Sequence, residues 1–246
     1  MSGAVAFLQS LDRGEARLDG EARDALLARY DANVRYADHE LADLLAHLRG
    51  LGVLDRAWLI VTSDHGEAFG EHGRFEHNST VYDEMLRVPL LVRPPDGLAK
   101  GIRVEEPVGL VDLAPTVLSW TGQPIPATFA GRMWPLSERA PYAARARLVS
   151  ARSASAPEWF AITDGDWKYL RPLASAPGGR EELYDLAADP RERTNLAATR
   201  TDSLGRLREA ADRELACERE QAATPRPLRV IPADTADALR ALGYVQ

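Results

Sequence analysis

The order of apolar patterns along the chain predicts an α/β fold followed by a smaller, mostly antiparallel unit. A long apolar stripe with helical spacing comes first, and a glycine turn and a short, continuous apolar run follow it. Farther along, short β-forming runs alternate with turn residues. With 246 residues, the chain is long enough for one large domain or two small ones.

The first predicted element is a helix over residues 23–49. His39 and His47 fall within it, and we interpret both as having a structural or surface role. The sequence GLG at residues 50–52 ends the helix. Its apolar side chains recur three or four positions apart and form one stripe: Leu26, Tyr30, Val34, Ala37, Leu41, Leu44 and Leu48.

Two short apolar runs predict strands near the centre of a sheet. Residues 57–61, AWLIV, follow the helix after a tight loop, and such a run is typical of a strand buried on both faces of a parallel sheet. Residues 88–92, VPLLV, have the same character. We expect the two to be neighbours or near neighbours. A short helix over residues 111–122 then ends at a glycine.

A segment without helical or strand periodicity, residues 122–146, separates this first part from a small antiparallel unit. We place the domain boundaries so that residues 1–137, 138–221 and 222–246 form an α/β part, a β plus helix subdomain and a tail. Residues 159–162 and 167–170 should pair as a hairpin, because Asp164 and Gly165 lie between them. Residues 201–220 predict a helix, and residues 234–243 a last short one.

Composition and charge exclude several classes of function. The net charge is −7 with acids and bases interspersed, so we expect no nucleic-acid partner. No run approaches the roughly 20 apolar residues of a membrane span, and we find no targeting signal, so we expect a soluble chain of unknown location. Cys217 is the only cysteine, which excludes an intrachain disulfide and a cysteine-based zinc site; we predict that it is an ordinary helical residue.

Three of the five histidines follow the first predicted strand, within residues 61–80. Asp64 and His65 come first, at the strand end where α/β sheets bind ligands. An aspartate oxygen and an imidazole nitrogen can bind one divalent cation. The same residues also fit a capped turn, with Asp64 bonded to backbone amides and His65 in solvent. Residue types and spacing leave both interpretations open.

His72 and His77 follow in the same loop, together with Glu67 and Glu71. The histidines could complete a metal shell, contact an anionic substrate or carry a proton near neutral pH. We interpret the two glutamates as loop acids that face the site without reacting.

Several segments together resemble the sulfatases of the alkaline-phosphatase-like superfamily. The resemblance begins near residue 22 and covers most of the chain. Its most specific part is residues 61–90, VTSDHGEAFGEHGRFEHNSTVYDEMLRVPL, and it returns in VGLVDLAPTVLSWTG, DGDWKYLRP and EELYDLAADPRERTNLA. The resemblance implies the C-terminal part of an alkaline-phosphatase-like mixed sheet flanked by helices, followed by a small antiparallel β plus helix subdomain.

The resemblance also implies roles for particular residues. Asp64 and His65 match the pair that completes the divalent-metal site, which usually holds calcium in sulfatases. His77 matches the Lys or His that contacts the sulfate ester, where a donor would neutralise a sulfuryl oxygen or protonate the leaving alcohol. Asn78 replaces a frequent glycine, and His72 belongs to the motif without an assigned role.

The family's nucleophile motif, C/S-x-P-S/A-R, is absent from the sequence. The resemblance therefore implies that the formylglycine nucleophile and the remaining metal ligands belong to an N-terminal half, as a separate partner or through a truncated or mis-called gene. We expect this chain to be part of a sulfatase acting on a sulfate ester. A phosphodiesterase or phosphonate hydrolase of the same superfamily and a catalytically inactive remnant are the alternatives.

Overall fold

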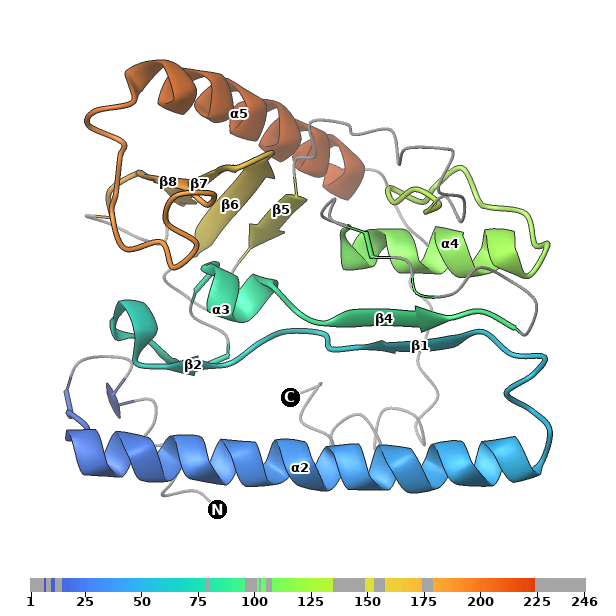
Figure 1. Cartoon of the computed structure of the whole chain (residues 1–246). Coiled ribbons are helices and arrows are strands. Elements are labelled where there is room, and N and C mark those ends of the chain that lie inside the picture. Colours follow the sequence, from blue (N-terminus) through green and yellow to red (C-terminus); the bar gives the residue numbers. More distant parts are fainter. Residues whose placement is uncertain are drawn as a thin grey trace. The chain divides into compact units, whose positions relative to one another are not determined.

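The computed structural model describes residues 7, 10–11, 15–77, 80–95, 101, 103–104, 108–134, 149–152, 158–173 and 179–223 (Figure 1). The chain divides into two compact units, Met1–Ala211 and Asp212–Gln246. The predicted boundary at residue 137 and the helix over residues 234–243 lie outside the described residues. Within those residues, no helix is both long enough and apolar enough to cross a membrane.

Helix α2, Gly20–Gly50, confirms the first predicted element. Asp19 caps its start, where a carboxylate oxygen accepts a hydrogen bond from the Ala22 N–H at 2.8 Å. Gly52 follows its end with φ of +65°, a conformation that favours glycine. Although the apolar stripe is present, none of the helix's residues is buried. The stripe is thus only partly covered within the described residues, where the Tyr30 ring packs edge-to-face on Phe69.

Strands β1, Leu59–Thr62, and β4, Leu90–Arg93, are neighbours, as expected. The expectation of a parallel, fully buried arrangement is wrong for this pair. The strands are antiparallel, with Ile60 opposite Val92, and Leu91 is 61% exposed (Figure 1). An apolar run does not indicate the direction of the neighbouring strand, because parallel and antiparallel pairing bury the same side chains.

Between β1 and β4 the chain forms the histidine-rich loop. Strands β2, Ala68–Phe69, and β3, Phe75–Glu76, pair antiparallel, and the 3-10 helix η1, Glu71–Gly73, connects them. Helix α3, Asp83–Leu86, is a single turn that leads toward β4. Within the described residues, the chain between β1 and β4 thus forms this loop and the single turn of α3, and no crossover helix.

The predicted helix over residues 111–122 forms as η2, Leu110–Asp112, and α4, Leu113–Trp120. Thr116 is buried, and its hydroxyl donates to the Asp112 carbonyl at 2.6 Å. The Trp120 ring stacks on Trp58 with a centroid distance of 4.2 Å. The stack joins α4 to the start of β1.

The small antiparallel unit is a four-stranded sheet in the order β5-β6-β7-β8. The predicted hairpin is confirmed: β6 and β7 pair in register, and the turn occupies only Gly165 and Asp166. Gly165 has φ of +60°, which a glycine adopts without strain. The strands are β5 (Val149–Arg152), β6 (Trp159–Asp164), β7 (Trp167–Pro172) and β8 (Glu182–Asp185).

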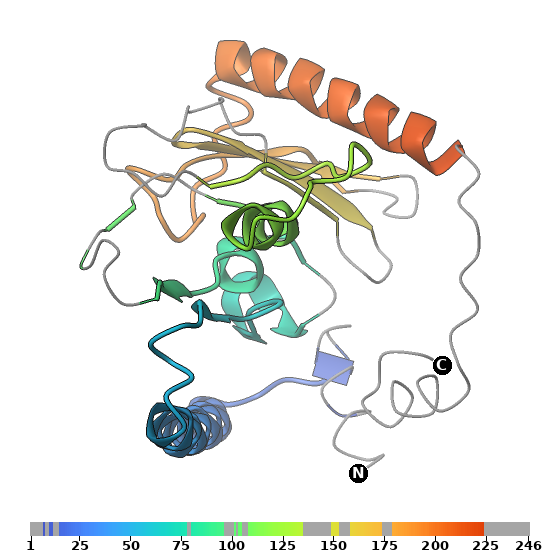
Figure 2. The same ribbon diagram turned by 90° about the vertical axis from the view of Figure 1, so that its right-hand side faces the viewer.

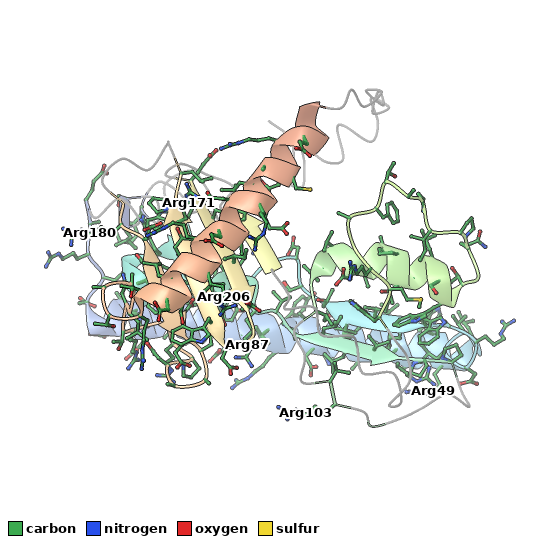
Figure 3. The ribbon with its side chains drawn as sticks, turned by 90° about the horizontal axis from the view of Figure 1, so that it is seen from above. Arg49, Arg87, Arg103, Arg171, Arg180 and Arg206 are labelled. Carbon is green, nitrogen blue, oxygen red and sulfur yellow. The ribbon has the colours of Figure 1, made fainter. Side chains whose placement is uncertain are left out.

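The sheet is covered on both faces. Helix α5 spans Thr201–Ala223, and its residues 201–211 lie over one face, while α3 lies toward the other (Figures 1 and 2). Arg206 extends from α5 and pairs with Asp164 at the end of β6 (Figure 3). On the face toward α3, Ala161, Leu170 and Tyr184 of the sheet form a buried cluster with Val81, which precedes α3. Alternate residues such as Tyr169 and Leu183, which are fully buried, therefore face α5.

Candidate functional site

Asp64 and His65 lie just beyond the end of β1, as the sequence predicts. The His65 Nδ1 is 2.8 Å from the Gly66 carbonyl oxygen, and a carbonyl only accepts, so Nδ1 carries the proton. This leaves the Nε2 lone pair free to bind a cation. Nε2 is 3.7 Å from the Asp64 Oδ1, and both side chains are exposed.

Gly66 fixes the path of this segment. Its N–H donates to the Met85 carbonyl at 2.8 Å, and the Glu67 N–H donates to the Glu84 carbonyl at 3.1 Å. A Cβ atom at Gly66 would lie 1.9 Å from the Glu84 carbonyl oxygen. Only glycine therefore allows the segment to approach α3 this closely.

His77 is brought to the same place from the other end of the loop. Its ring stacks on the His65 ring, with centroids 4.5 Å apart and planes inclined by 12°. The His77 Nδ1 is 3.2 Å from a Glu67 carboxylate oxygen, so Nδ1 donates and Nε2 points elsewhere. Glu67 is thus a loop acid that orients the His77 ring. Asp64, His65 and His77 gather at the carboxyl end of β1, which is the amino end of the antiparallel β4.

The arrangement fits part of a metal site. Two calcium ligands each lie about 2.3–2.6 Å from the ion, so oxygen and nitrogen atoms 3.7 Å apart can share one ion. Within the residues that the structure describes, no group of three or more His, Cys, Asp or Glu could hold a metal. Asp64 and His65 can therefore supply only two ligands of a larger shell.

His72, to which the sequence assigned no role, lies in a different environment from the other histidines. Its Nδ1 is 2.9 Å from a Glu84 carboxylate oxygen, and its Nε2 is 2.9 Å from the Glu192 carbonyl oxygen. The Tyr82 ring stacks on it with a centroid distance of 3.7 Å. Burial lowers the pKa of His72, but the hydrogen bonds to Glu84 and Glu192 outweigh burial and raise it above its usual value.

A buried ion cluster lies next to His72 and was not predicted from sequence. Lys168 is fully buried in β7, and its Nζ is 2.6 Å from Asp83 and 2.7 Å from the Glu192 Oε1. Glu192 is also buried and has φ of +52°. Burial raises the pKa of Glu192, and the Lys168 ammonium offsets this only in part. A lysine between apolar residues of a strand was the available signal, since a buried cation needs acidic partners.

Several other sequence predictions concern single residues. Glu71, expected to face the site, instead accepts a hydrogen bond from the Phe69 N–H and pairs with Arg23 of α2. His39 and His47 are exposed on α2, as predicted. Cys217 lies in α5 and is exposed. Asn78 lies outside the described residues.

Comparison with family models places most of the chain in two matching regions. Residues 8–123 match the model described as Sulfatase. Residues 70–220 match the model described as N-sulphoglucosamine sulphohydrolase, C-terminal. The second match includes His72, His77 and the four-stranded sheet, whereas Asp64 and His65 fall within the first match only.

Curated proteins with similar sequences include arylsulfatase K of Xenopus laevis, which is 32% identical over 72% of this chain and 34% of that protein. Choline-sulfatase of Rhizobium meliloti (strain 1021) is 32% identical over 68% of this chain and 32% of that protein. The chain thus spans about a third of the length of the curated relatives it matches.

Solved structures with the same fold include a phosphonate monoester hydrolase of Agrobacterium radiobacter, with a TM-score of 0.66 and 26% identity over 82% of this chain and 43% of that one. The structure of BT4656 in complex with its substrate D-glucosamine-2-N,6-O-disulfate gives a TM-score of 0.58 and 27% identity, over 76% of this chain and 39% of that one. The observed elements are thus part of an alkaline-phosphatase-like fold.

Proposed function

Because this chain belongs to the sulfatase family, we propose that it supplies part of the active site of a sulfuric ester hydrolase. In this proposal Asp64 and His65 hold a divalent metal ion, calcium, and His77 contacts the sulfate ester. The observation that carries the proposal is the stacking of His77 on His65 at the end of β1, with a centroid distance of 4.5 Å. This contact unites the proposed metal ligands and the proposed substrate contact.

The protein residues have distinct tasks in this reaction. The Gly66 carbonyl holds the His65 tautomer, so Nε2 remains available to the ion. Glu67 orients His77 through Nδ1, so that a protonated Nε2 can donate to a sulfuryl oxygen or to the leaving alcohol. When bound, the ion would stabilise negative charge on the ester oxygens.

We further propose that the other part of such a domain, an N-terminal half with the formylglycine nucleophile and the remaining metal ligands, packs on this chain. It would be a separate chain or another part of a longer one. Two observations support this: the chain spans about a third of its curated relatives, and α2 buries none of its residues. Apolar side chains exposed on this helix include Tyr30, Val34, Tyr36 and Leu44.

Hydrolysis of a phosphonate or phosphate ester is the second candidate. The phosphonate monoester hydrolase of Agrobacterium radiobacter supports it, since its fold and 26% identity match as well as those of the sulfatase structures. Both ester classes present charged oxygens around a tetrahedral centre, which Asp64, His65 and His77 would contact in the same way. Paired assays distinguish them.

The test is reconstitution. The chain is purified alone and co-expressed with a sulfatase N-terminal half that carries a matured nucleophile, and both are assayed with an aryl sulfate and an aryl phosphonate ester in calcium and in chelator. We expect turnover only with both halves and calcium. His77→Ala should reduce it by about 10²–10⁴-fold, whereas His39→Ala, at an exposed position of α2 outside the apolar stripe, should not.

Each outcome separates the candidates. Turnover by the chain alone would contradict the proposed dependence on another half. Faster hydrolysis of the phosphonate than of the sulfate would favour the second candidate. No turnover of either ester by the reconstituted pair would favour a catalytically inactive remnant.

A further inference from the structure

Helix α3 is bonded to the histidine-rich loop on one side and to the β5–β8 sheet region on the other. On the loop side, the carbonyls of Met85 and Glu84 accept the N–H groups of Gly66 and Glu67. Gly66 adjoins His65, and the Glu67 carboxylate lies 3.2 Å from the His77 Nδ1. The position of α3 therefore determines where the two stacked histidines lie.

On the sheet side, α3 is held by buried charges. Lys168 bonds the Asp83 carboxylate at 2.6 Å, and the Glu192 Oε2 accepts the Asp83 N–H at 2.6 Å. Lys168 and Glu192 are themselves paired at 2.7 Å, and neither side chain is exposed. The first residue of α3 is thus fixed through both its side chain and its backbone.

A second connection runs through His72. It bonds the Glu84 side chain in α3 and the Glu192 carbonyl at the same time. Among the described residues, His72 and Glu192 are the only ones other than glycine with positive φ, at +51° and +52°. Both residues hold an unfavourable backbone conformation, and they bond each other. Such strain persists only where the surrounding structure enforces it.

The bonds of Lys168, Glu192 and His72 to α3 also fix the position of this helix. Helix α3 is one turn long, and a single turn has no stability of its own. Well-packed apolar groups often stabilise a protein interior as well as a buried ion pair does, so stability alone does not account for this cluster. Each bond on the sheet side ends on Asp83 or Glu84. The carbonyls that bind the Gly66 and Glu67 N–H groups belong to the same short helix.

We propose that Lys168 and Glu192 are positioning residues, which hold α3 so that Gly66 and Glu67 keep His65 and His77 stacked. The contribution of these residues to a reaction rests on the proposed function, but the positioning itself does not. It can be measured on the full chain without any substrate.

The experiment compares amide hydrogen exchange and the contact between the two imidazole rings, both by NMR. In Lys168→Met, the Gly66 and Glu67 amides should exchange about tenfold faster or more than in the parent chain, and the nuclear Overhauser effect between the His65 and His77 rings should weaken. Asp83→Asn provides a second variant that removes one carboxylate with little change in shape. It should show the same two changes in smaller degree.

Leu183→Ala is the matched control, because Leu183 is fully buried in β8 on the face of the sheet away from α3. Its loss of stability in denaturant can be compared directly with that of Lys168→Met. Selective loss of Gly66 and Glu67 protection in the two charge variants, with the ring contact intact in Leu183→Ala, is the expected result. If Gly66 and Glu67 respond in Lys168→Met only as much as in Leu183→Ala, the positioning role is wrong, whatever the reconstituted activity.

Discussion

His72 should be positively charged in the folded protein, because both of its ring nitrogens face acceptors. A Glu84 carboxylate oxygen lies 2.9 Å from Nδ1 and the Glu192 carbonyl oxygen 2.9 Å from Nε2. A neutral imidazole can donate only one of these bonds, whereas imidazolium donates both. The stacked Tyr82 ring adds a favourable contact for a cation. His72→Gln therefore tests whether this charge stabilises the fold.

The size of the effect follows from these contacts. A hydrogen bond that involves a charged group contributes about 1.5–3 kcal/mol, and glutamine can replace at most one of the two with an uncharged donor. We expect His72→Gln to lower the free energy of unfolding by about 2–3 kcal/mol at about pH 6. The side chain is only 16% exposed, so solvent screens these bonds little.

The effect should decrease as the pH rises. The folded-state pKa of His72 is raised above its usual value, so the folded state binds the proton more tightly than the unfolded state. The stabilisation is fully present below the unfolded pKa of about 6.5 and is lost as the pH rises through the folded pKa.

Urea unfolding of both proteins at about pH 6 and about pH 9 measures this difference. His39→Gln is the control, because the ion pair of His39 with Asp43, at 3.8 Å, is exposed and should contribute less than about 1 kcal/mol. A difference between parent and His72→Gln that is equal at both pH values, or larger at the higher one, would refute a charged His72.

Three further changes test the loop and the sheet. Gly66→Ala should lose about 2–4 kcal/mol of stability, because its Cβ would meet the Glu84 carbonyl, whereas Gly205→Ala, which meets nothing within 4 Å, should gain about 0.5–1 kcal/mol in urea unfolding; equal effects would contradict the close approach. Glu67→Gln should lower kcat of the reconstituted enzyme by roughly 10–100-fold, and an unchanged kcat would exclude Glu67 from orienting His77. Arg208→Gln breaks a partly exposed pair with Glu181 and should cost less than about 1 kcal/mol in the same unfolding assay; a larger loss would show that the pair is not screened.

The elements that the sequence predicted well have strong local patterns. The apolar stripe gave helix α2 within three residues at its start and one at its end, and Asp164 and Gly165 located the β6–β7 turn. The gathering of Asp64, His65 and His77 followed from motif resemblance. Their roles stay predictions, since the described residues supply only two proposed metal ligands. The direction of β4 depends on the chain between the strands, which an apolar run does not encode.

The buried cluster shows where sequence reasoning stops. In the segment WKYL, strand alternation places Lys168 on the same face as Leu170, so a buried cation with acidic partners could have been inferred. The partners themselves could not, because Asp83 is 85 residues before Lys168 and pairs with it only through the tertiary fold. Glu192 reaches Lys168 through a positive φ that the sequence does not indicate. Both acids become identifiable only once α3 and the sheet are placed together, and the same packing relates the sheet to His65 and His77.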